Sequence, residues 1–327
     1  MNTFILSLFT KEDKLKAKTL FQILVGKRTS SVLSYAYFHN LLHLFGCLPN
    51  LTEELLETSL NQLKEQGILE EEDGQWILIK EQKLPNKALL EQVDYFKFGR
   101  KEMEIWRSVQ FLVQAVSFLA TDKTYVPIES SPFYTERVRQ VIYQYRDEIK
   151  ETLYVELKDV FTKLKVEQAN LLAGTFSGNH RNGEVFFQLL PEDLQEEPWK
   201  KLSISCGLHS FCAEVQAQKP RILYSFLKPL FIQNLNKSML VTRKMLQSGV
   251  SVGQVMQQRR LKLGTVQDHI IEWALLEETF PFEKFIDNQQ NLMELPEDSW
   301  KQSYKELVEQ FDSNFLEIRL YQIWRKG

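Results

Sequence analysis

The sequence predicts a mainly α-helical protein with an N-terminal winged-helix-like module, a helical middle region and a C-terminal helix-turn-helix module. Apolar residues recur at helical spacing along most of the 327-residue chain. Helix breakers are scarce, with 13 Gly and 10 Pro, which favours helices over a strand-rich sandwich. An apolar fraction of 43% is sufficient for hydrophobic cores in two or three domains. We expect the domains to span residues 1–87, 88–235 and 236–327.

The first module reads as three helices followed by a β-hairpin, which is the order of a winged helix. Apolar spacing predicts helices over 14–25 and 31–45, and Thr52 or Asn50 can cap a third helix over 52–66. Two short strands within 68–79 flank the turn-forming pair Asp73-Gly74. The third helix and the hairpin are rich in glutamate, and this charge repels phosphate. We therefore expect the module to serve packing or protein contact.

The middle region is expected to be helical and amphipathic from Leu89 to Leu235. A glycine-rich break, Gly174–Gly183, interrupts the helical pattern. It lacks the Gly-Lys-Ser/Thr ending of a phosphate-binding P-loop, and it does not have the spacing of a dinucleotide-binding fingerprint. The sequence therefore predicts a turn-rich loop there.

The C-terminal module contains the segment with the clearest mechanism. We expect a first helix over 238–247, a second over 252–260 capped by Ser251, and a third over 265–274 after the turn at 261–264. The last two helices and their turn form a helix-turn-helix, Ser251–Leu276, whose final helix can enter a DNA major groove. A long last helix is predicted over about 297–324.

Local charge suggests that this module contacts DNA. The whole chain has a net charge of −3, but Lys237–Ala274 carries six basic and two acidic residues. Arg259, Arg260 and Lys262 precede the third helix, where they can clamp phosphates. Thr265 and Gln267 project from its first turn and can reach base edges. The remaining candidate DNA-binding residues are Asp268, which flanks that face, and the first-helix pair Arg243 and Lys244.

Three functions remain open for this module. Backbone clamping predicts DNA binding that weakens steeply with salt and shows little sequence preference. A transcriptional regulator would read an operator with a large specificity ratio. A protein-only interaction module would not bind DNA, and the acidic residues Asp268 and Glu272 on the third helix are consistent with that reading.

The same residues resemble a known family. The pattern Thr242, Leu246, Gly249-Val-Ser-Val252, Arg259, Leu261-Lys262, Thr265-Val266, Asp268-His269-Ile270 and Glu272 resembles the helicase-associated helix-turn-helix. That module is appended to RecQ-type helicases and also ends the YpbB family of Firmicutes proteins. The segments 30–52, 176–189 and 315–320 are also similar to that family. The resemblance implies an accessory factor for a RecQ-type helicase in DNA repair or recombination.

No motif predicts an enzyme, a cofactor or a metal site. A nucleophile elbow, a kinase motif set and a P-loop are absent from the sequence. Cys206, His209 and Cys212 have helical spacing but no evident fourth ligand, so we expect buried packing residues instead of a zinc site. The apolar start Met1–Thr10 is short and lacks a basic flank, and no later run is long enough to span a membrane. We expect a cytoplasmic protein.

Overall fold

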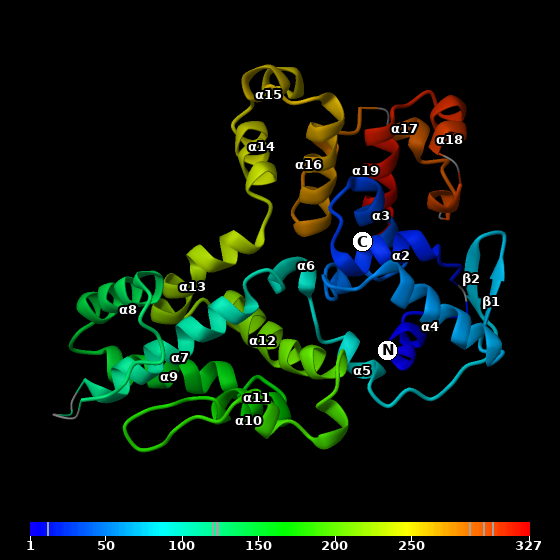
Figure 1. The fold of residues 1–327 in the computed structure, drawn as a ribbon. Helices are drawn as coiled ribbons and strands as arrows, with labels where there is room; N and C mark the ends of the chain where they lie inside the picture. The colour runs from blue at the N-terminus through cyan, green and yellow to red at the C-terminus, as the bar shows by residue number, and fades with distance from the viewer. Residues whose placement is uncertain (12, 120, 122–123, 288, 297, 303) are drawn as a thin grey trace. The chain divides into compact units, whose positions relative to one another are not determined.

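The computed structural model describes residues 1–327 apart from 12, 120, 122–123, 288, 297 and 303. It is mainly helical, as predicted, and its described strands form one two-stranded sheet (Figure 1). Packing divides the chain into two compact units. Unit 1 contains Met1–Lys11, Thr58–Leu69 and Leu78–Asn234, and unit 2 contains Glu12–Glu57, Glu70–Ile77 and Leu235–Gly327.

This division does not follow the three consecutive modules expected from the sequence. The expected boundary at 235/236 lies next to the boundary at Asn234, but residues 1–87 are shared between the units. The physical reason is that α3 (Ser30–Phe38) packs against α16 (Leu263–Leu276) and α19 (Phe315–Lys326) near the end of the chain. Which segments fold independently stays a prediction.

The N-terminal region has the predicted order of three helices and a hairpin. These elements are α2 (Ala17–Val25), α3, the short η1 (Leu42–Leu44), α4 (Glu53–Glu65), β1 (Leu69–Glu72) and β2 (Gln75–Leu78). Asp73 and Gly74 both have positive φ, +49° and +73°, as a two-residue hairpin turn requires. Leu15 pairs with Trp76 through two backbone hydrogen bonds, which extends the pairing beyond the hairpin. The predicted hairpin is therefore confirmed.

Unit 1 is built around α12 (Trp199–Gln218), which is buried along most of its length. The helices around it include α7 (Glu102–Phe118), α9 (Ile149–Phe161), α10 (Val166–Gly174) and α13 (Arg221–Asn234). The other described helices of this unit are α1 (Asn2–Ser7), α5 (Lys87–Leu90), α6 (Tyr95–Phe98), α8 (Pro132–Gln144), α11 (Phe186–Leu189) and the single turn η2 (Glu192–Leu194).

The glycine-rich break between α10 and α11 is a loop, as expected, and packing explains its composition. A Cβ atom added to Gly183 would lie 2.2 Å from the carbonyl oxygen of Thr175, so no larger residue fits there. The Thr175 hydroxyl accepts a 3.0 Å hydrogen bond from the indole N–H of Trp106 in the core. The loop is thus anchored to the hydrophobic core of unit 1.

Unit 2 places α16 among α14 (Lys237–Gln247), α15 (Val252–Arg259), α3 and α19 (Figure 1). The shared core includes Val255, Val266 and Ile270, which are fully buried. The remaining elements of the C-terminal part are η3 (Phe282–Lys284), α17 (Gln289–Leu292), η4 (Ser299–Lys301) and α18 (Tyr304–Gln310).

The prediction of one long last helix over 297–324 was wrong. Residues 297 and 303 lie outside the described residues, and the described part of this range contains η4, α18 and α19. Asp312 has a left-handed backbone with φ +44°, which ends the helical path after α18. The Asn314 side chain then accepts a 3.1 Å hydrogen bond from the Glu317 amide and caps a new helix.

Candidate nucleic-acid interface

The first three helices of the C-terminal module, α14, α15 and α16, begin and end within a few residues of the predicted positions. Asn236 caps α14 by accepting hydrogen bonds from the amides of Ser238 and Met239, at 3.0 and 3.3 Å. Ser251 and Gln254 form a capping box at the start of α15. Each cap satisfies backbone donors that the first turn of a helix leaves unpaired.

The turn between α15 and α16 presents two positive side chains to solvent. Arg260 has a left-handed backbone, φ +53°, and ends α15, while Lys262 occupies the position before α16. Both side chains are exposed. Within the part of the chain that the structure describes, neither forms a side-chain hydrogen bond or an ion pair. These two cations are available to an external anion.

The N-terminus of α16 next to these cations is open. Lys262 provides no side-chain cap, although its carbonyl accepts a 3.0 Å hydrogen bond from the Thr265 amide. Among the described residues, the amides of Leu263 and Gly264 have no acceptor. An added Cβ at Gly264 would meet no heavy atom within 4 Å, which leaves room for close approach by another molecule. Helix N-termini favour phosphate because the amides point outward and the helix dipole is positive there.

The Arg259 side chain, by contrast, forms hydrogen bonds to other residues of unit 2. Its guanidinium donates to the Ser238 carbonyl at 2.8 Å, to the Ser238 hydroxyl at 2.9 Å and to the Thr242 hydroxyl. The side chain therefore ties α15 to α14. Arg243, another predicted DNA-binding residue, forms an ion pair with Glu277, which also accepts a 2.8 Å hydrogen bond from the indole of Trp273.

The hydrogen bonds of Arg259 continue to a buried histidine. The Thr242 hydroxyl, which accepts from Arg259, also forms a 2.8 Å hydrogen bond with Nδ1 of His269. Burial lowers the pKa of His269 below its ordinary value of 6.5, and the positive charge of Arg259 lowers it further.

This arrangement predicts a loss of stability in mild acid. Because the folded-state pKa of His269 is depressed, its contribution is present above about pH 6.5 and is lost as the pH falls through the lower pKa. We expect the urea midpoint to fall between about pH 7.5 and about pH 5, and to fall less in His269→Gln. Identical pH profiles for the two proteins would contradict this role of His269.

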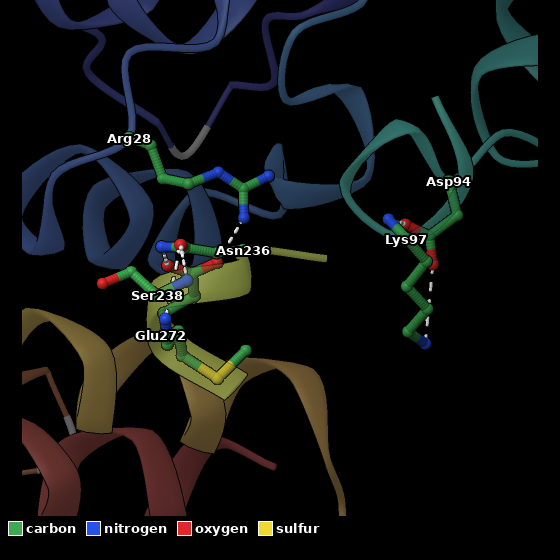
Figure 2. Close-up of polar contacts among 7 residues, drawn as sticks. Arg28, Asp94, Lys97, Asn236, Ser238 and Glu272 are labelled. Atoms are coloured by element: carbon green, nitrogen blue, oxygen red, sulfur yellow. Dashed lines mark hydrogen bonds and ion pairs between the residues drawn. The ribbon is translucent and has the colours of Figure 1, made fainter. Parts of the chain in front are cut away.

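The acidic residues of α16 bind the N-terminal part of unit 2. Asp268 accepts a 3.3 Å hydrogen bond from the backbone amide of Ser30, the first residue of α3. Figure 2 shows Arg28 reaching the buried carboxylate of Glu272, to which Asn236 also donates at 2.8 Å. The charges that opposed DNA binding in the sequence therefore have intramolecular partners.

The predicted site residues thus separate into two groups. Three have intramolecular partners, namely Arg243, Arg259 and Asp268. Lys244, Arg260 and Lys262 are exposed, and Thr265 and Gln267 are half-buried in the first turns of α16. Because α3, α14 and α19 pack along α16, base contacts by its middle and end would require these helices to move. The open part is its first turn.

Two features of the site could not be predicted from the sequence. The open amides at the start of α16 could not be recognised from residue types, because every residue except proline has a backbone N–H. The pairing of Arg28 with Glu272 joins residues 244 positions apart. Lys237 is exposed at the first position of α14. It contributes to the local positive charge but was not among the predicted DNA-binding residues.

The cysteine and histidine cluster of α12 has internal partners in unit 1. The Cys206 thiol donates to the Leu89 carbonyl at 3.1 Å, and burial raises its pKa to about 12. His209 accepts a 2.9 Å hydrogen bond from the Asp94 amide at Nδ1, and its Nε2 lies 2.8 Å from Glu102. Burial likewise raises the pKa of Cys212. These buried side chains are therefore part of the interior of unit 1.

Comparison with known proteins supports the helix-turn-helix. Residues 238–322 match a family model described as a helix-turn-helix domain. The chain is also similar to protein YpbB of Bacillus subtilis (strain 168), with 21% identity over 84% of this chain and 81% of that protein. No solved structure matches. Among the described residues, no helix is both long enough and apolar enough to cross a membrane.

Proposed function

We propose that this YpbB-like helix-turn-helix protein is a non-enzymatic, DNA-associated accessory factor that contacts the duplex backbone through the first turn of α16. The observation that carries the proposal is the exposed pair Arg260 and Lys262 beside an uncapped helix N-terminus. The match to a helix-turn-helix domain supports DNA as the ligand. We further propose that it acts in the cytoplasm alongside a RecQ-type helicase in DNA repair or recombination.

The helicase role rests on the resemblance of residues 242–272 to the helicase-associated helix-turn-helix. The binding surface for the helicase would lie in the C-terminal module or in the exposed acidic hairpin Glu70–Asp73. A pull-down of the full chain with a purified RecQ-type helicase, followed by an unwinding assay, tests this part. Lack of association, with unchanged unwinding, would remove the helicase from the proposal and leave DNA binding to be judged separately.

Backbone contact is favoured over operator reading by the packing of α16. Since α3 covers part of this helix, we expect base contacts only from its first turns, at residues such as Thr265 and Gln267. Recognition by phosphate contacts alone gives affinity without sequence preference. We therefore expect similar affinities for unrelated duplexes of equal length. A large preference for one sequence would favour a transcriptional regulator instead.

The double variant Arg260→Ala/Lys262→Ala tests the contact itself. Each lost phosphate contact reduces the slope of log affinity against log salt by about one, so the double variant should lower it by about two for every duplex. Fluorescence anisotropy with mixed-sequence duplexes over a salt series measures this slope. Lys158→Ala/Lys163→Ala, which removes two exposed lysines from unit 1, is the matched control and should leave the slope unchanged.

Two outcomes of this experiment would count against the proposal. An unchanged slope in Arg260→Ala/Lys262→Ala would show that DNA binds elsewhere on the chain. Absence of duplex binding by the folded wild-type protein at low salt would leave a protein-only interaction module as the remaining function.

A further inference from the structure

Unit 2 contains a cavity of about 580 Å³ that takes no part in the helix-turn-helix interface. Its walls come from the segment before α2, from α3, and from the region between η4 and α19. Six of its lining residues have aromatic rings: Tyr35, Phe38, His39, Trp300, Tyr304 and Phe315. A cavity of this size and composition is in the range of small-molecule binding sites.

One positive side chain in this wall has no counter-ion among the residues that the structure describes. The Arg319 guanidinium is 5.3 Å from the ring centre of Phe38 and 5.7 Å from that of Phe315. Burial lowers its pKa to about 10, so it remains charged at neutral pH. Over the described ranges, no acceptor forms a hydrogen bond or an ion pair with it. A partly desolvated cation of this kind favours an anionic ligand.

A second polar group in the cavity wall is also unpartnered. The Ser34 side chain is 1% exposed, and its hydroxyl has no hydrogen-bond partner among the residues that the structure describes. Buried hydroxyl groups normally have a hydrogen-bond partner, so a bound ligand would supply the partner of Ser34. Ser34 precedes Tyr35 on α3, and both line the cavity.

The charge of the cavity is positive in an otherwise slightly acidic protein. Among the described residues, the basic ones in the lining are Lys14, Lys16, Lys301 and Arg319, and the one carboxylate is Asp13, which lies 2.9 Å from His39. Lys14 is paired with Glu72, but Lys16 and Lys301 are exposed at the cavity. The described lining therefore has excess positive charge for an anion.

The aromatic rings in the lining indicate which other chemical group the ligand contains besides an anion. Trp300 stacks on Phe38 with ring centres 5.3 Å apart and planes within 6°. Tyr304 is 46% exposed, so part of its ring is free to contact a ligand. Flat aromatic surfaces next to cations are the combination that proteins use for unpaired nucleobases and their phosphates. A duplex hides its base faces within the stack, whereas a single strand presents them.

From these observations we propose that the cavity binds a base and phosphate of single-stranded nucleic acid, with Arg319 on the phosphate and Tyr304 against the base. This site shares no residue with the surface at Arg260 and Lys262. It extends the proposed function and does not depend on it. The same unit would then contact a duplex at one surface and an unpaired strand at another.

The test uses a fluorescein-labelled oligothymidylate of about ten nucleotides and the full-length protein. Tyr304→Ala removes a stacking surface and should weaken binding by about 5-fold to 100-fold. Arg319→Gln should weaken binding and flatten its salt dependence. Lys305→Ala, an exposed residue next to Tyr304 that does not line the cavity, is the matched control and should bind like wild type.

Competitors then identify the ligand chemistry. An abasic oligomer or inorganic phosphate should compete far less well than oligothymidylate, because neither carries a base to stack. Equal competition by a poly-glutamate peptide would overturn the proposal in favour of a generic anion or acidic-peptide site.

The proposals for the two sites can be tested separately, because each has its own variants. Arg260→Ala/Lys262→Ala should retain oligothymidylate binding, and Tyr304→Ala should retain duplex binding. Wild-type affinity for oligothymidylate in Tyr304→Ala would overturn the proposal, even if Arg319→Gln proved unstable.

Discussion

Replacing Glu272 with alanine is expected to lower the free energy of unfolding of unit 2 by about 3–5 kcal/mol, the range for breaking a buried ion pair. The Glu272 side chain is 4% exposed and that of Arg28 is 18% exposed. The variant would leave Arg28 without this carboxylate and would remove the acceptor of the Asn236 amide. The Arg28 guanidinium would stay charged while largely shielded from water, and this accounts for most of the expected loss of stability.

Urea unfolding followed by circular dichroism measures this effect. The matched control is Glu278→Ala, which replaces an exposed glutamate just beyond the end of α16. It should change the free energy of unfolding by less than about 0.5 kcal/mol. The double variant Arg28→Leu/Glu272→Leu should recover much of the loss, because it removes both charges together. A Glu272→Ala protein as stable as the Glu278→Ala control would show that this pair does not hold α3 on α16.

Replacing Arg259 with alanine is expected to destabilise unit 2 by about 2–3 kcal/mol, since hydrogen bonds to charged groups contribute more than neutral ones. The variant loses the three hydrogen bonds that join α15 to Ser238 and Thr242 on α14. It should also raise the pKa of His269, because Arg259 is one of the causes that lower it. NMR titration of the His269 ring would follow that change.

The neighbouring Arg260 provides the control for Arg259. Arg260→Ala should leave stability nearly unchanged, since the side chain is exposed, but it should reduce duplex affinity. Arg259→Ala should show the opposite pattern under conditions where the variant remains folded. If Arg259→Ala reduced duplex affinity as much as Arg260→Ala without a loss of stability, Arg259 would be a phosphate contact after all.

Local sequence signals predicted the elements of this protein well. The Ser251 cap and the spacing of Val255, Val266 and Ile270 located the helix-turn-helix, because caps and apolar periodicity act within a few residues. Asp73-Gly74 likewise predicted the hairpin turn, since both positions need positive φ. The break at Asp312 was missed because apolar spacing continues on both sides of it.

Long-range pairing could not be predicted in the same way. Arg259 and Arg260 are identical in type and adjacent, yet one binds Ser238 and the other faces solvent. Their different roles depend on the left-handed turn at Arg260, which sequence spacing does not reveal. The attachment of α3 to α16 depends on Arg28 and Glu272 meeting across most of the chain. The cavity around Arg319 combines segments from both ends for the same reason.

The most direct test of the interface is photo-cross-linking to duplex DNA from the first turn of α16. Leu263 is 47% exposed at the start of this helix, and Ile232, also 47% exposed, lies on α13 in unit 1. A photoreactive residue at position 263 should cross-link to a mixed-sequence duplex in low salt, and the same residue at 232 should not. Cross-linking at 232 without cross-linking at 263 would contradict DNA contact through this turn.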